Sequence, residues 1–122
     1  PLQLHKKPFI NLYTMVKSNN LELYEKTHSA EALVLSCIDY RYIDNMINYL
    51  ERTPINKKYD VTALAGASLS YNQKKYKHWK KTFKDTLGLA IELHHIKQLI
   101  VFDHMDCGAY QIFYPDLTPN SE

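Results

Sequence analysis

The stretch ALVLSCIDYR at residues 32–41 decides the fold of this chain. Its first five residues form a short, continuous apolar run that is rich in branched side chains and ends in a polar cluster. Such a run is typical of a strand that is buried on both faces of a sheet. Cys37, Asp39 and Arg41 follow directly. The stretch therefore predicts a buried strand whose carboxyl end carries a thiol, a carboxylate and a guanidinium.

Helical and strand patterns alternate outward from this stretch. Strands are predicted at residues 32–36, 59–65 and 98–103, and helices at residues 42–52, 77–95 and 107–114. This order is typical of an α/β domain with a mostly parallel sheet, flanking helices and right-handed crossovers. Because parallel strands end at one edge of the sheet, the residues that follow each strand are expected to lie close together.

Two details of this pattern carry further expectations. The third strand, with LIVF at its centre, is expected to be buried like the first. In the long helix, a stripe that includes Phe83, Ala90 and Ile91 is expected to face the core. Gly88 lies inside this helix, where glycine costs about 1 kcal/mol relative to alanine. We therefore expect close packing at Gly88.

The chain divides into two parts by pattern. Residues 1–28 show only broken apolar periodicity, and we expect a helical arm there. Residues 29–122 contain all the predicted strands and form the α/β domain. The chain lacks an initiator methionine, which suggests a fragment or a trimmed chain.

Composition excludes several classes of protein. The 122 residues carry 15 basic and 13 acidic side chains, and a net charge of +2 gives no reason to expect nucleic-acid binding by the whole protein. No apolar stretch is long enough to span a membrane, and no signal-peptide pattern is present. Two cysteines without a secretion signal favour a cytoplasmic protein with reduced thiols.

The second cysteine lies in the stretch HMDCG at residues 104–108, directly after the third predicted strand. Cys37, His104 and Cys107 would therefore meet at one edge of the sheet. Two sulfurs and one imidazole nitrogen are a known ligand set for catalytic zinc, which keeps its fourth position for water or substrate. The sequence thus predicts a zinc site made by these three residues.

Asp39 and Arg41 complete this predicted site. In an extended segment, alternation would point Cys37, Asp39 and Arg41 the same way, so that Asp39 could accept a hydrogen bond from metal-bound water while Arg41 orients it. Asp39 could instead occupy the fourth zinc position, or the pair could be a local surface contact. Asp103 and Asp106 are expected to be turn residues or groups that orient a ligand.

Other features have simpler interpretations. The run of lysines between residues 74 and 81, interleaved with Tyr76 and Trp79, resembles a nucleic-acid patch, but it is more typical of a solvated helix face. The remaining histidines are expected on helix faces or at the surface; they are His5, His28, His78, His94 and His95.

Taken together, the two motifs resemble the zinc signature of β-class carbonic anhydrases. That family carries Cys-x-Asp-x-Arg followed by His-x-x-Cys-Gly, with an Ala-Gly turn between them, and this chain has CIDYR at 37–41, AG at 65–66 and HMDCG at 104–108. The resemblance covers roughly residues 30–114. It implies an α/β fold around a mostly parallel sheet, with N-terminal helices that embrace a partner subunit in a homodimer or larger homo-oligomer.

The resemblance also implies a mechanism. Cys37, His104 and Cys107 would bind zinc, and Asp39 and Arg41 would form the catalytic dyad. The activity would be the reversible hydration of carbon dioxide to bicarbonate by a zinc-bound hydroxide, because zinc lowers the pKa of its bound water to roughly 7.

This chain departs from the family pattern, and the departures leave alternatives open. It has Ala63-Leu64 where the family commonly has Arg-Asn, and Tyr40 where the family commonly has Ser. It also ends about 15 residues after Cys107, which suggests a fragment or an incomplete sheet. One alternative is a zinc-binding domain of this family that serves assembly or binding without hydratase activity. The other is a hydrolase of a small carbon dioxide analogue such as carbon disulfide.

Overall fold

The computed structural model describes residues 29–116, and the arm predicted for residues 1–28 lies outside the described residues. Strands and helices alternate along the chain, as the sequence predicts. The elements are β1 (Ala32–Ser36), the 3₁₀ turn η3 (Tyr40–Tyr42), α2 (Ile43–Glu51), β2 (Tyr59–Ala63), α3 (Ser68–Asn72), α4 (His78–His94), β3 (Gln98–Phe102) and α5 (Gly108–Phe113).

The three strands form one parallel sheet in the order β2-β1-β3. In register, Ser36 at the end of β1 lies beside Ala63 of β2 and Phe102 of β3. All three strands therefore end at the same level, so the residues that follow them share one edge of the sheet. The predicted α/β class is confirmed for a small three-stranded sheet.

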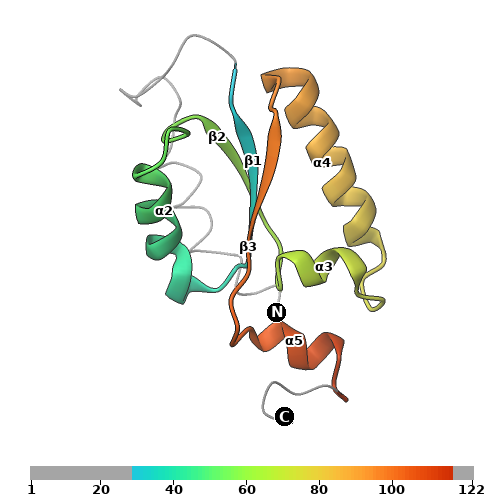
Figure 1. Cartoon of the computed structure of the whole chain (residues 1–122). Helices are drawn as coiled ribbons and strands as arrows, with labels where there is room; N and C mark the ends of the chain where they lie inside the picture. Colours follow the sequence, from blue (N-terminus) through green and yellow to red (C-terminus); the bar gives the residue numbers. More distant parts are fainter. Residues whose placement is uncertain (1–28, 117–122) are drawn as a thin grey trace, which may run out of the picture.

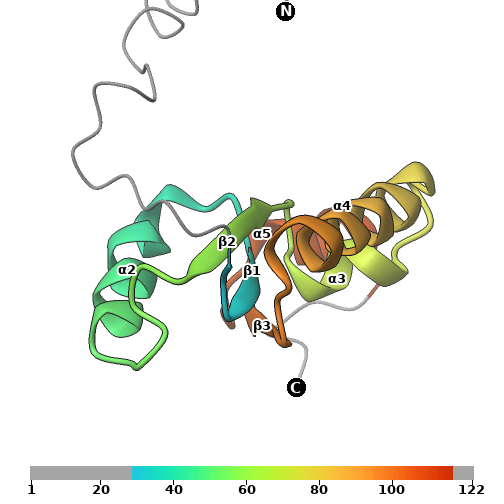
Figure 2. The same cartoon turned by 90° about the horizontal axis from the view of Figure 1, so that it is seen from above.

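Helices cover both faces of this sheet (Figures 1 and 2). Helix α2 lies on one face, α3 and α4 lie on the other, and α5 lies at the carboxyl ends of the strands. Strand β1 is central and fully buried, and its side chains alternate between the two faces. Two apolar clusters result. One holds Ala32 and Val34 with Met46 and Leu50 of α2. The other holds Leu33, Leu35, Cys37, Ala67, Phe83, Ala90, Ile96 and Cys107.

Burial on the outer elements differs from the sequence prediction. Strand β3 is an edge strand, and Leu99 and Val101 are 42% and 39% exposed rather than buried. In α4, Phe83 and Ala90 face the core, but Ile91 is 51% exposed. An apolar run alone does not distinguish a central strand from an edge strand, because that depends on the order of strands in the sheet.

Helix α3 has no counterpart in the sequence prediction. It follows Gly66 and is only five residues long. Tertiary contacts hold its start, because the Ser68 backbone N–H and the Ser68 hydroxyl both donate to the carboxylate of Asp103, at 3.0 and 2.5 Å.

Within residues 29–116, no helix is both long and apolar enough to cross a membrane.

The two glycines Gly66 and Gly88 have opposite environments. Gly66 has a φ of +91°, and a Cβ built there would lie 3.2 Å from both the Leu69 Cβ and a ring carbon of Phe113. A Cβ at Gly88 would meet no atom within 4 Å. The close packing expected at Gly88 is therefore wrong, because this side of α4 is open.

We expect Gly66→Ala to destabilise the fold. The left-handed backbone and the two short contacts together should lower the free energy of unfolding by about 1–3 kcal/mol. Gly88→Ala is the matched control and should raise it by about 0.5–1 kcal/mol, because alanine is a better helix former. Urea unfolding measures both. A Gly66→Ala variant as stable as the Gly88→Ala variant would contradict this account of the turn.

Candidate metal centre

Three potential metal ligands converge at the shared edge of the sheet. One ligand atom each from Cys37, His104 and Cys107 lies within 4.8 Å of the other two. These are the three residues that the sequence predicts as zinc ligands. They form the one group of this kind among residues 29–116. The arrangement is close enough to hold a single metal ion.

Local structure explains how each ligand reaches this point. Cys37 directly follows β1, so its thiol lies on the same face as Leu33 and Leu35 and is buried. Cys107 is the N-cap residue of α5, and its carbonyl oxygen accepts from the N–H of Tyr110 at 3.1 Å. His104 lies in the loop between β3 and α5 with its side chain 11% exposed.

The separation of the two sulfur atoms is compatible with a tetrahedral zinc ion. The Sγ atoms of Cys37 and Cys107 lie 3.8 Å apart. Two sulfurs bound to one zinc ion at about 2.3 Å with a tetrahedral angle would be about 3.8 Å apart. The Nε2 atom of His104 is buried and has no hydrogen-bond partner among the described residues. A buried nitrogen without a partner is costly unless something binds it, and a metal ion would do so.

The electrostatics of the two thiols differ. Burial raises the pKa of Cys37, but the hydrogen bond from the Gly66 N–H and the nearby imidazole of His104 outweigh this effect, so that its pKa lies below the ordinary value. The Gly66 N–H donates to the Cys37 Sγ at 3.3 Å. Burial raises the pKa of Cys107, and the neighbouring Cys37 adds to this rise. A negative charge is therefore more stable on Cys37, and a bound cation would favour thiolates at both positions.

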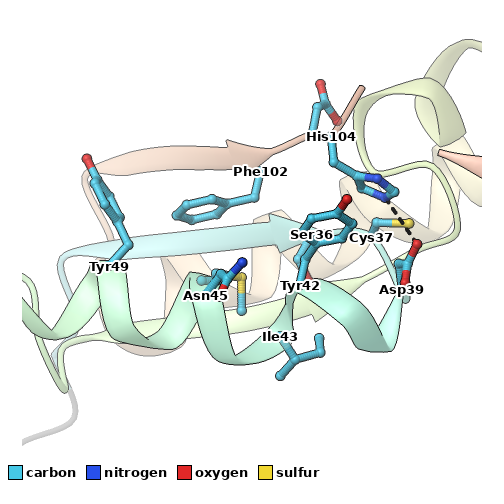
Figure 3. Close-up of a pocket in the computed structure, with 11 residues that line it drawn as sticks. Ser36, Cys37, Asp39, Tyr42, Ile43, Asn45, Tyr49, Phe102 and His104 are labelled. Carbon is cyan, nitrogen blue, oxygen red and sulfur yellow. Dashed lines mark ion pairs between the residues drawn. The ribbon is translucent and has the colours of Figure 1, made fainter. Parts of the chain in front are cut away.

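Asp39 and Arg41 form a strong pair beside this group. The Arg41 Nη2 and Nε donate to the Asp39 carboxylate at 2.6 and 3.0 Å, and the Arg41 backbone N–H donates to it at 3.0 Å. Hydrogen bonds from Arg41 lower the pKa of Asp39 to about 2. The Oδ2 atom of Asp39 is 3.8 Å from the Nε2 of His104 (Figure 3).

The way this pair forms differs from the prediction. Asp39 has an extended backbone, but Arg41 lies in the 3₁₀ turn η3, which Asp39 caps. The carboxylate and the guanidinium therefore meet across a turn and not by alternation along an extended segment. Asp39 also lies outside the group of three ligand atoms. Its oxygens contact Arg41.

Cavities flank the centre on two sides. One, of about 240 Å³, lies between the sheet and α2 and is lined mainly by apolar and aromatic side chains, among them Tyr42, Tyr49 and Phe102, with Cys37 and His104 at one end (Figure 3). The other, of about 290 Å³, lies toward α3 and α5 and is lined by all three candidate ligands together with Gly66, Ser68 and Tyr110.

A comparison with protein families now identifies the group to which the chain belongs. A family model described as "Putative carbonic anhydrase" matches residues 27–116, which include both motifs and the whole described fold. The chain belongs to this carbonic anhydrase family.

Two curated relatives are similar in sequence to a large part of this chain. A protein of Rickettsia bellii is 40% identical over 84 residues, covering 69% of this chain and 51% of the relative. A protein of Rickettsia conorii is 40% identical over 85 residues, covering 70% of this chain and 46% of the relative. Both are described only as uncharacterized. The chain thus spans about half the length of these relatives. No solved structure matches significantly.

Within this carbonic anhydrase family domain, one contact residue was missed by the sequence reasoning. The ring of Tyr42 contacts that of His104, with centroids 4.5 Å apart and the two planes tilted by 33°. Its position five residues after a cysteine carries no metal-binding signal, so the motif alone could not reveal it. Asp106, expected in a turn or beside a ligand, contacts His104, and Asp103 caps the start of α3.

The other predicted features lie away from the centre. His94 pairs with Asp60 at 2.7 Å, and His78 is exposed; His5 and His28 lie outside the described residues. The lysines of the basic run are exposed, as a solvated face would be, and Tyr76 stacks on Trp79 with centroids 4.7 Å apart.

Proposed function

We propose that this chain is a zinc-dependent carbonic anhydrase domain that hydrates carbon dioxide reversibly to bicarbonate. The observation that carries the proposal is the convergence of two thiols and one imidazole, with a carboxylate beside them that a guanidinium holds in place. A structural zinc site would need four protein ligands, whereas this group supplies three. Membership of the carbonic anhydrase family supports the same activity.

Cys37, His104 and Cys107 would hold the zinc ion. A bound zinc ion would supply an activated water molecule, because zinc lowers the pKa of coordinated water to about 7. The two thiols would bind as thiolates, and the backbone N–H of Gly66 already stabilises negative charge on Cys37.

Asp39 and Arg41 would act as the catalytic dyad. With a pKa of about 2, Asp39 is a carboxylate at neutral pH and can only accept hydrogen bonds. It would accept one from the reacting water and so orient the oxygen that attacks carbon. Arg41 keeps Asp39 charged and fixed, because it donates to both carboxylate oxygens. The apolar cavity beside Asp39 suits a small, uncharged substrate such as carbon dioxide.

Zinc analysis combined with stopped-flow hydration tests this function. We expect about one zinc ion per chain, with hydration that disappears on chelation and returns when zinc is added. A chain that binds zinc but does not hydrate carbon dioxide would overturn the proposed activity. In that case, release of hydrogen sulfide from carbon disulfide would identify the analogue hydrolase, and no release would leave a zinc-binding assembly domain.

We also propose that the protein is a cytoplasmic homodimer or larger homo-oligomer. Three apolar side chains beside the metal centre are strongly exposed, namely Ile38 at 63%, Tyr40 at 85% and Met105 at 95%. Exposed apolar groups gathered at one place are typical of an interface. The free cysteines would stay reduced in the cytoplasm. Sedimentation equilibrium should give at least twice the mass of one chain.

A further inference from the structure

One exposed carboxylate joins the two motifs. The Oδ1 of Asp106 contacts the Nδ1 of His104 at 2.9 Å and accepts from the Tyr42 hydroxyl at 2.8 Å. Its Oδ2 accepts from the Arg41 Nη1 at 3.0 Å. The Asp106 carboxylate thus contacts three side chains. Two of them come from the segment after β1, and one comes from its own loop. Asp106 lies one residue before Cys107, but it belongs neither to the ligand group nor to the Asp39–Arg41 dyad. The proposed catalytic role of the site therefore does not explain why Asp106 makes these contacts.

The contact with His104 decides which ring nitrogen can bind a metal. A carboxylate accepts hydrogen bonds, so the Nδ1 of His104 must carry the proton in this contact. The lone pair of the neutral ring then lies on Nε2, the buried nitrogen that has no partner among the described residues and belongs to the ligand group. Fixing the other nitrogen of a histidine ligand in this way sets its tautomer and its orientation.

The contact between Asp106 and Arg41 connects Asp106 to the Asp39–Arg41 pair. Arg41 uses Nε and Nη2 for Asp39 and Nη1 for Asp106. Its planar guanidinium is therefore held between two carboxylates, and its plane is fixed from both sides. Without the Asp106 carboxylate, Arg41 would keep Asp39 as a partner and its longer contact of 3.5 Å with the Asp106 carbonyl oxygen, but it would lose the shorter hydrogen bond from Nη1 to the His104 loop.

We propose that Asp106 is a positioning residue that couples the imidazole ligand to the Asp39–Arg41 pair. One carboxylate oxygen holds the proton-bearing side of His104, and the other holds Arg41, so a single side chain aligns the metal ligand and the dyad with each other. This proposal rests on the proposed metal centre and assigns to Asp106 a role in zinc affinity that a turn residue would not have.

Competition with a zinc chelator measures this role directly. Asp106→Asn keeps the shape of the side chain, but it removes the charge and replaces one acceptor oxygen with a donor. We expect zinc to bind about 10- to 100-fold more weakly, which is the usual effect of losing the partner of a histidine ligand. Asp85→Asn is the matched control, because it also removes an exposed carboxylate from a pair with a cation, Lys81, and it lies on α4. Its affinity should stay within about twofold of the parent chain, since no group near the ligands changes.

Two further measurements separate positioning from simple stability. Urea unfolding of the metal-free variants should give the same midpoint for Asp106→Asn and Asp85→Asn, because both carboxylates are exposed. Nitrogen-15 NMR of the parent chain should show His104 with its proton on Nδ1, and Asp106→Asn should weaken this preference. Because this measurement is made on the parent chain, it tests the tautomer even if a variant does not fold.

The outcomes are distinguishable from failure of the proposed function. A parent chain that binds no zinc would overturn the metal centre itself. A parent chain that binds zinc, with Asp106→Asn binding it equally well, would overturn the role of Asp106 alone. A proton found on the Nε2 of His104 in the parent chain would also overturn it.

Discussion

Replacing Cys107 with serine should leave the chain without bound zinc and without hydratase activity. A serine hydroxyl is a poor zinc ligand at neutral pH, and losing one of three protein ligands leaves only Cys37 and His104 in the group. After zinc loading and dialysis against metal-free buffer, the zinc content measured by elemental analysis should fall from about one ion per chain in the parent to near zero in the variant. Carbon dioxide hydration should fall to the uncatalysed rate.

Matched histidine variants control for zinc bound elsewhere. His104→Gln should lose zinc as Cys107→Ser does, because it removes the imidazole ligand. His78→Gln should keep it, because His78 is exposed on α4 and is not in the ligand group. Zinc retained by both Cys107→Ser and His104→Gln would show that the metal binds at a different place.

The second large effect is expected at Asp39. Asp39→Asn keeps the size of the side chain but removes the charge that holds Arg41. Stopped-flow hydration should slow by about 10²-fold or more, because the reacting water would lose the carboxylate that orients it. Zinc content should not change, because Asp39 lies outside the ligand group.

The zinc content of this variant distinguishes the two roles considered for Asp39. If Asp39→Asn retains zinc and loses hydration, the carboxylate acts on the reacting water. If the variant loses zinc, the carboxylate is a fourth ligand and the dyad assignment fails. Asp85→Asn again serves as control and should hydrate carbon dioxide at the parent rate.

The sequence predicted the elements that local patterns determine. The apolar run of β1 is continuous and central, so pattern and burial agree, and all five of its residues are buried. The positions of the candidate ligands followed from parallel topology, because strands that end in register place their next residues together. Cys37 and the segment that begins directly after β3 were therefore expected at the same edge of the sheet.

Features that depend on long-range arrangement could not be predicted in this way. The exposure of Leu99 and Val101 depends on β3 lying at an edge, which no pattern within the strand specifies. Helix α3 depends on a contact between Ser68 and Asp103, which are 35 residues apart. The contacts of Asp106 with Arg41 and Tyr42 likewise join residues that are distant in sequence, and they exist only once β1 and β3 are neighbours.

X-ray absorption at the zinc edge tests the central claim most directly, because it reports the atoms bound to the metal in the loaded chain. The account predicts two sulfur atoms at about 2.3 Å, one imidazole nitrogen at about 2.0–2.1 Å and one further light atom in the fourth position. That set requires Cys37, Cys107 and His104 to bind one ion. A zinc ion surrounded only by oxygen and nitrogen, or by a single sulfur, would contradict it.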